Sequence, residues 1–176
     1  MNTINYFVLG ILFIPTAFFC LIVHELGHWS AGKILGYKMR FGLNIVKTID
    51  VDKKSILFTS GGLFFTFLLS LGSWVVVEIY KINFLYMFIF FNFIMRLSAQ
   101  IINFKLQDEA IISEYFNLRK YTIAIIVNII LLVFTLRSSF ILGYNFIYHT
   151  ICLIGSLIGI ISVIYIDQYL WKIRKK

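Results

Sequence analysis

The sequence predicts an all-α polytopic membrane protein with about five transmembrane helices. Three observations lead to this fold class. Of its 176 residues 60% are hydrophobic, and there is a single proline, a composition outside the range of soluble domains. Five apolar runs approach or exceed the roughly 20 residues that cross a bilayer. Basic residues gather in every second connection between these runs. We therefore expect residues 1–176 to form a single membrane domain, without a separate soluble domain.

The five apolar runs cover residues 6–28, 56–77, 82–104, 121–136 and 140–166. The fourth run is short and the fifth is long, so these two helices should differ in tilt or in their true boundaries. The first run begins without a basic segment and contains no small-residue cleavage site. It is therefore interpreted as a retained helix and not as a signal peptide.

The formal net charge of +8 predicts an orientation in the membrane, since the basic residues cluster on one side. By the positive-inside rule the N-terminus is outside and the C-terminus is cytoplasmic. The pattern favours cationic anchors on anionic lipid over nucleic-acid binding. The remaining connections carry only Lys81 and Arg137. The residues assigned to the cytoplasmic side are Lys33, Lys38, Arg40, Lys47, Lys53, Lys54, Lys105, Arg119, Lys120, Lys172, Arg174, Lys175 and Lys176.

A metal-binding pattern closes the first apolar run. His24 and His28 are four residues apart, and Glu25 follows the first of them. Four helical residues advance about 400°, so both imidazoles lie on one face and can bind one Zn²⁺, with the carboxylate reaching a water molecule. Lys33 follows five residues later, which places the site in the cytoplasmic half of the bilayer, where ionisable groups are costly and usually functional. The alternative is that these residues merely cap a helix at the interface.

A catalytic zinc site with two histidines needs a third protein ligand and one open position. His149 and Glu78 are predicted at the opposite leaflet, and Asp167 lies beside the basic C-terminal tail. Cys20, four residues before His24, shares its helix face but is more typical of a packing residue. The candidates that remain are the acidic residues after the third apolar run: Asp108, Glu109 and Glu114. The alternative for this acidic group is a solvated interfacial loop paired with nearby lysine and arginine side chains.

Three further features of the sequence carry predictions. Segments 43–51 and 56–59 are rich in β-branched residues around a turn at 52–54, which predicts a β-hairpin-like loop that offers an edge strand to a peptide, or else an interfacial loop without a binding role. Arg96, within the third run, either snorkels to the interface or takes part in the site. Gly155 and Gly159 have the spacing of close helix packing, with a dimer contact as the alternative.

The pattern His24-Glu25-Leu26-Gly27-His28 in a membrane helix, followed by a basic loop and a later aspartate, resembles the site-2 protease family of intramembrane zinc metalloproteases. The resemblance covers about residues 18–114. The family's Asn-x-x-Pro segment, followed by Asp-Gly, is largely replaced: Gln100 stands at the Asn position, Asn103 at the Pro position and Glu109 at the Gly position, while Asp108 is retained. Ser60-Gly61-Gly62 is what remains of a Gly-Pro-containing motif. No inserted PDZ-like domain is present, as in a minimal bacterial member.

The resemblance implies a catalytic core at about residues 6–114, additional helices at about 121–166 and a basic tail at 167–176. It also implies one Zn²⁺ held by His24, His28 and Asp108, with Glu25 as general base for hydrolysis of a peptide bond. Substrate contacts would come from Gln100, Asn103 and Asn44. The substrate would be membrane-embedded: a small membrane peptide, a signal-peptide remnant or a regulatory protein. The alternative is a non-proteolytic transporter, immunity-type or peptide-holding protein, with a structural or vestigial metal site closed by Cys20 or Glu109.

Overall fold

The computed structural model describes residues 3–40, 47–48 and 55–174. In this part of the chain, five helices are long and apolar enough to cross a membrane, so the predicted all-α, multi-pass membrane fold is confirmed. The elements in chain order are α1 (Thr3–Ile34), β1 (Met39–Arg40), β2 (Lys47–Thr48), α2 (Ile56–Tyr80), α3 (Leu85–Asn103), the 3-10 helix η1 (Phe104–Leu106), α4 (Asp108–Tyr115), α5 (Thr122–Leu142) and α6 (Phe146–Arg174).

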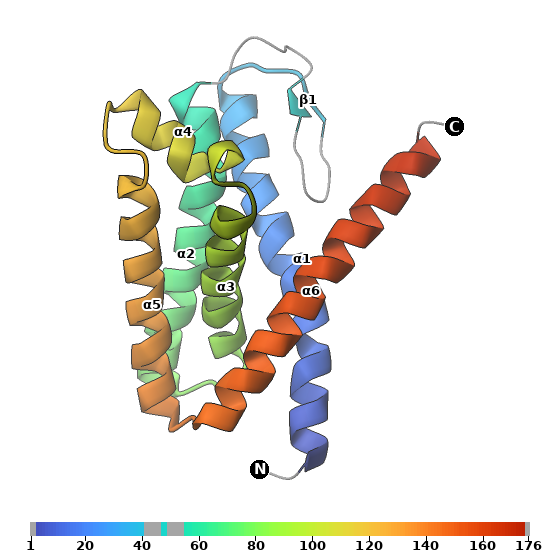
Figure 1. Ribbon diagram of the computed structural model, residues 1–176, viewed down its shortest axis with the longest axis vertical. Helices are drawn as coiled ribbons and strands as arrows, with labels where there is room; N and C mark the ends of the chain where they lie inside the picture. Colours follow the sequence, from blue (N-terminus) through green and yellow to red (C-terminus); the bar gives the residue numbers. More distant parts are fainter. Residues whose placement is uncertain (1–2, 41–46, 49–54, 175–176) are drawn as a thin grey trace.

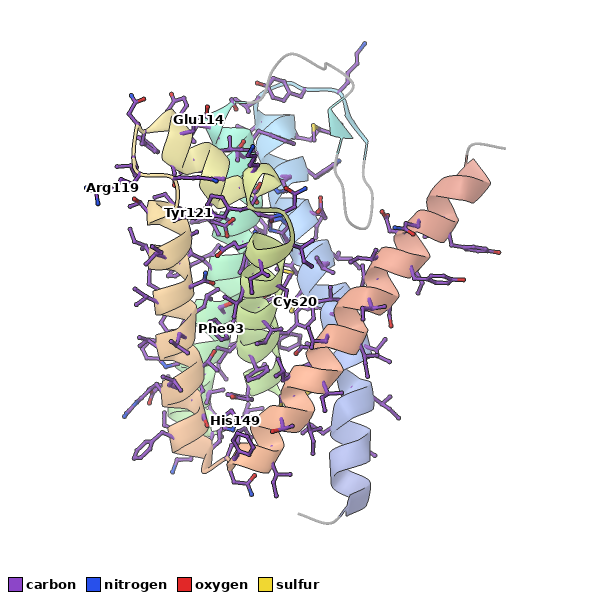
Figure 2. All side chains as sticks on the ribbon, viewed as in Figure 1. Cys20, Phe93, Glu114, Arg119, Tyr121 and His149 are labelled. Carbon is purple, nitrogen blue, oxygen red and sulfur yellow. The ribbon has the colours of Figure 1, made fainter. Side chains whose placement is uncertain are left out.

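The long helices form a bundle that is capped at one end by the short helix α4 (Figure 1). Helices α2, α3 and α5 run alongside one another, and α6 crosses α1 obliquely so that its C-terminal half diverges from the bundle (Figure 1). Cys20 and Phe93 lie inside the bundle, whereas Glu114 and His149 lie near its opposite ends (Figure 2). The bundle therefore has two distinct ends, one at α4 and one at the α5–α6 connection.

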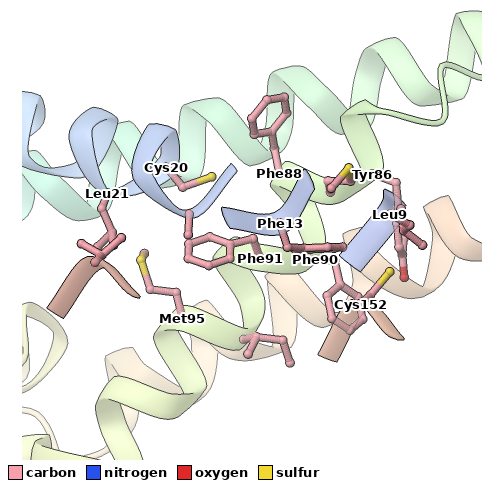
Figure 3. Close-up of a cluster of buried hydrophobic side chains, with 14 of the residues drawn as sticks. Leu9, Phe13, Cys20, Leu21, Tyr86, Phe88, Phe90, Phe91, Met95 and Cys152 are labelled. Carbon is pink, nitrogen blue, oxygen red and sulfur yellow. The ribbon is translucent and has the colours of Figure 1, made fainter. Parts of the chain in front are cut away.

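The main hydrophobic core lies between α1, α3 and α6. Phe13 and Cys20 from α1 pack with Phe91 and Met95 from α3 and with Cys152 from α6 (Figure 3). A second cluster joins α2, α3 and α5, and includes the stacked rings of Trp74 and Phe134. Both cysteines are free thiols within the core. Aromatic and aliphatic packing thus fixes α3 at the centre of the bundle, in contact with every other long helix.

The predicted boundary between the fourth and fifth membrane helices is wrong. The sequence placed the break around Arg137, but α5 continues to Leu142 and α6 begins at Phe146. Arg137 lies near the end of this helix, where its Nε donates to Glu78 Oε1 of α2 over 2.8 Å. The helix ends where Gly143 takes a left-handed conformation, φ 67°, a common helix stop. The predicted basic tail is largely helical, since α6 extends to Arg174.

The predicted hairpin-like loop is present after the first helix, but with different strands. Strand β1 pairs antiparallel with β2 in the register Met39–Thr48 and Arg40–Lys47. Residues 56–59, predicted as a strand, instead form the first turn of α2, because the Ser55 side chain accepts a hydrogen bond from the Phe58 N–H and caps the helix. The predicted turn at 52–54 and the candidate substrate contact Asn44 lie outside the described residues.

Small residues allow close helix crossings, as predicted. A Cβ on Gly27 of α1 would overlap the backbone carbonyl of Gly61 in α2, so these two helices touch backbone to backbone. Gly155 and Gly159 of α6 pack in the same way against Phe13 and Ala17 of α1. The small-residue face of α6 is therefore occupied by α1 of the same chain, which is the packing role expected from its spacing.

Candidate metal centre

Two histidines on α1 and the first residue of α4 meet at one point. His24 Nε2 and His28 Nε2 are 3.2 Å apart, since a four-residue spacing stacks the two side chains on one helix face. Asp108 Oδ2 lies 3.5 Å from His24 Nε2 and 3.4 Å from His28 Nε2. Within the described part of the chain, this is the group of three His, Cys, Asp or Glu side chains whose ligand atoms converge. The prediction that Asp108 lies on the same side as the histidines is confirmed.

The other ring nitrogen of each histidine faces a hydrogen-bond acceptor. His28 Nδ1 lies 2.9 Å from the Phe58 carbonyl oxygen, which can only accept, so this nitrogen carries the proton. His24 Nδ1 lies 3.1 Å from Thr66 Oγ1, whose own hydroxyl hydrogen is directed to the Gly62 carbonyl. With both protons on Nδ1, both Nε2 lone pairs point toward the Asp108 carboxylate. Partners of this kind commonly orient histidines that bind metal.

Three acceptor atoms that face one another are mutually repulsive unless a cation or a shared proton lies between them. The distances between the atoms, 3.2 to 3.5 Å, fit the edge of a tetrahedron built on Zn–N and Zn–O bonds of about 2.0–2.1 Å, which is about 3.4 Å. Two histidines, one carboxylate and an open fourth position form a donor set suited to catalytic zinc. The residues present therefore fit the predicted metal.

The carboxyl group of Asp108 is ionised throughout the neutral range. Burial by itself would raise its pKa, but when the site holds a proton in place of a metal, the hydrogen bond that His28 then donates and the nearby Arg96 charge outweigh this effect. The pKa falls from 3.8 to about 2. A ligand carboxylate must be deprotonated to bind a metal, so Asp108 is ready for this role without a further proton loss.

Arg96 points into the same group of residues and does not snorkel to the interface. Its side chain is only 4% exposed, with Nη2 at 2.6 Å from His24 Nδ1 and 3.3 Å from Thr66 Oγ1. A guanidinium only donates hydrogen bonds, so its contact with His24 Nδ1 requires a proton on Nε2. The contact between His24 and Thr66 requires the opposite tautomer. Of the two, only the Thr66 arrangement leaves Nε2 able to bind a metal.

A cavity of about 590 Å³ opens onto these residues. Glu25, which is 4% exposed, lines the cavity together with His24, His28 and Asp108. Its apolar walls come from α1, α2, α3, α4 and α6, and Asn103 and Gln107 contribute polar amides. Gln107 precedes Asp108 directly and donates to the Asn103 carbonyl over 3.1 Å. The four motif residues thus share one solvent-accessible space with room for a peptide segment.

Several predicted site residues have other surroundings. Gln100 does not line the cavity; its Oε1 accepts a hydrogen bond from Asn128 of α5 over 2.5 Å, so the predicted substrate contact is not supported. Glu114 is exposed on α4. His149 lies at the opposite end of the bundle (Figure 2), as expected. Cys20 belongs to the core and Glu109 pairs with Arg96, so among the described residues neither closes the metal site.

Some residues of the site were not identified from the sequence. Thr66 and the Phe58 carbonyl group orient the histidines, and Gln107 lines the cavity. Thr66 carries a weak signal, since it is a polar residue in an apolar helix. The backbone carbonyl group of Phe58 carries no signal in the sequence, because every residue has one. Comparison of the chain with protein-family models, curated proteins and solved structures gives no match.

Proposed function

We propose that this protein is an intramembrane zinc metalloprotease that hydrolyses a peptide bond of a membrane-embedded substrate. The observation that carries the proposal is the convergence of His24 Nε2, His28 Nε2 and Asp108 Oδ2 at 3.2 to 3.5 Å beside Glu25 in one cavity. Zinc-dependent peptide hydrolysis is also supported by the H-E-x-x-H spacing and by the similarity to site-2 proteases. Asp108 supplies the third ligand that this chemistry requires.

His24, His28 and Asp108 would hold one zinc ion. When bound, zinc supplies a Lewis acid that polarises a carbonyl group and lowers the pKa of a water molecule. The chain's own contribution is to hold the three donor atoms in place. Phe58 and Thr66 fix the histidine rings, and Gly62 leaves room for them, since a Cβ there would overlap both imidazoles.

Glu25 acts as the general base. It follows His24 directly in α1 and lines the same cavity, so its carboxylate is within the site where water attacks the peptide. It accepts a proton from the attacking water and delivers it to the leaving amine. Replacing the carboxylate with an amide of the same shape removes this proton transfer and leaves the three ligand side chains unchanged.

The cavity fits an unwound segment of peptide. A helical substrate hides its carbonyl groups in hydrogen bonds, so it must be locally extended before attack. Asn103 and Gln107 offer amides to the freed backbone, while Ile160 and Ile164 of α6 supply apolar wall. His24 and His28 lie within the first membrane-spanning helix, so the proposed substrate is a membrane peptide, and by the positive-inside rule it is cut in the cytoplasmic half of the bilayer.

The test compares wild type with Glu25→Gln after reconstitution with candidate membrane peptides. We expect wild type to cleave and Glu25→Gln to leave the peptide intact, while both bind one equivalent of zinc. Glu78→Gln, which changes a carboxylate at the far end of the bundle in the same way, serves as the matched control and should cleave like wild type. Zinc content is measured by elemental analysis and cleavage by mass spectrometry.

If zinc binds but wild type and Glu25→Gln both leave all tested peptides intact, the proteolytic proposal fails, and the alternative with a structural metal site gains support. If wild type does not bind zinc, the metal centre itself is contradicted.

A further inference from the structure

A buried ion pair lies directly behind the metal-binding atoms. Arg96 Nη1 is 3.5 Å from Glu109 Oε1, with exposed fractions of 4% and 0% for the two side chains. Among the described residues, neither carboxylate oxygen of Glu109 has a hydrogen-bond partner, and Arg96 is its ion-pair partner. Two opposite charges removed from water in this way depend on each other, because an unpaired buried charge is strongly unfavourable.

Arg96 also lies close to two of the proposed metal ligands. Its Nη1 is 3.7 Å from Asp108 Oδ2, and its Nη2 is 2.6 Å from His24 Nδ1. Both contacts oppose metal binding. A guanidinium on Asp108 competes for the ligand carboxylate, and donation to His24 Nδ1 places the ring proton on Nε2. In this structure the guanidinium contacts Glu109 and both ligands at once, so Glu109 and the ligands compete for the same cation.

We propose that Glu109 is a positioning residue that competes with Asp108 and His24 for the Arg96 guanidinium and draws it off both ligands as the metal binds, so that they become available to the metal. The inference rests on the metal centre proposed above. Glu109 is suited to this role because it follows Asp108 directly at the start of α4, and its fully buried carboxylate faces the guanidinium from the same helix as the ligand. Arg96 and Glu109 thus act as a pair, because each charge would be uncompensated beside the metal site without the other.

The experiment measures zinc affinity of the purified full-length protein in detergent, by competition with a chromophoric chelator. Three variants are compared with wild type: Glu109→Gln, the double variant Arg96→Gln/Glu109→Gln, and Glu114→Gln. The last changes an exposed glutamate of the same helix and serves as the matched control. The visible absorption spectrum of each Co²⁺-loaded protein gives a second readout, because it reports the ligand geometry at the metal. Circular dichroism and size-exclusion chromatography monitor folding.

We expect Glu109→Gln to lower zinc affinity by about 10- to 100-fold, the range seen when partners of metal ligands are removed, and to change the Co²⁺ spectrum. Removing Arg96 as well should restore affinity to within about threefold of wild type, since no cation remains to compete. Glu114→Gln should match wild type in both measurements. A purely structural role of the pair would also let the double variant fold better than Glu109→Gln. It would, however, leave the zinc affinity of the folded protein and its Co²⁺ spectrum like wild type in both variants.

Two results would overturn the inference. One is a folded Glu109→Gln variant with wild-type affinity and Co²⁺ spectrum. The other is a double variant that binds zinc no better than Glu109→Gln, which would show that Arg96 does not compete for the ligands. If Glu109→Gln does not fold, Glu109→Asp takes its place, because it keeps the charge but moves it away from Arg96. A lowered zinc affinity with a changed Co²⁺ spectrum then supports the inference, and wild-type values overturn it. If the proposed metal centre itself is wrong, wild type binds neither Zn²⁺ nor Co²⁺. This result is distinct from a failure of the Glu109 inference, in which wild type still binds both ions.

Discussion

The two ends of the helix bundle use the same residue types in different ways. At the end near α4, His24 and His28 each satisfy one ring nitrogen with a neighbouring acceptor, and direct the other toward Asp108. At the opposite end, His149 uses both nitrogens locally: Nε2 pairs with Ser139 Oγ at 2.8 Å, and Nδ1 with the Asn145 carbonyl at 2.7 Å. A histidine with both nitrogens engaged within the protein ties helices together. Histidines that each direct one ring nitrogen toward a common point can together bind a ligand there.

The arginine–glutamate pairs differ in the same way. Arg137 and Glu78 lie at the far end with exposed fractions of 54% and 26%, at 2.8 Å, whereas Arg96 and Glu109 are almost fully buried and 3.5 Å apart. An exposed pair is screened by its surroundings and contributes little. A buried pair is costly unless it is compensated, so its position beside the proposed ligands indicates a role in the site.

The largest contrast is expected between His28→Ala and His149→Ala. Loss of His28 removes an atom that binds the metal, so zinc affinity should fall by more than about 100-fold. Removing a group that only hydrogen-bonds to a metal ligand already lowers metal affinity by about 10- to 100-fold. His149→Ala should leave zinc affinity unchanged. Chelator competition on both purified variants checks this prediction, and equal affinities would contradict the difference drawn between the two ends.

Glycine substitutions in α2 test the space under the histidines. A Cβ at Gly62 would overlap His24 and His28, whereas Gly72 has nothing within 4 Å of the added atom. We expect Gly62→Ala to reduce zinc affinity by about 10- to 100-fold through displaced imidazoles, and Gly72→Ala to bind zinc like wild type. If both variants bind equally well, the rings do not pack over Gly62 as described.

Thr66→Val removes the acceptor for His24 Nδ1 and keeps the shape of the side chain. We expect about a tenfold loss of zinc affinity, because the ring loses the contact that selects its tautomer. Thr135→Val is the matched control: Thr135 is equally buried and also donates to the carbonyl four residues earlier, but it lies on α5. Similar zinc affinities for the two variants would remove Thr66 from the site.

The smallest effect is expected for Glu78→Gln. Its partner Arg137 is exposed, so removing the carboxylate should leave both zinc affinity and the thermal midpoint of unfolding close to wild type. Zinc titration and a thermal melt in detergent test this expectation. A loss as large as that of Glu109→Gln would show that the two ion pairs are not different in kind.

Local patterns explain how much of the fold and site was predictable. Hydropathy runs located the membrane helices. One boundary was misplaced at Arg137, because a charged side chain near the end of a membrane helix does not stop it, and α5 ends only at Gly143. Charge placement put Asp108 at the histidine end of the bundle, where it is found. For residues 56–59 the predicted membrane run from residue 56 is confirmed, whereas the predicted strand is wrong, since β-branched content was overruled by the helix cap at Ser55.

The sequence by itself determined the membrane class and the pairing of His24 with His28, because apolar run length and a four-residue helical spacing are local properties. Only the tertiary structure decided the rest. It turned Gln100 toward Asn128, brought Asp108 within 3.5 Å of both histidines, and directed Arg96 inward to Glu109. The physical reason is that each of these depends on how separate helices pack, and in an apolar bundle a buried polar group takes whichever partner the packing brings within reach.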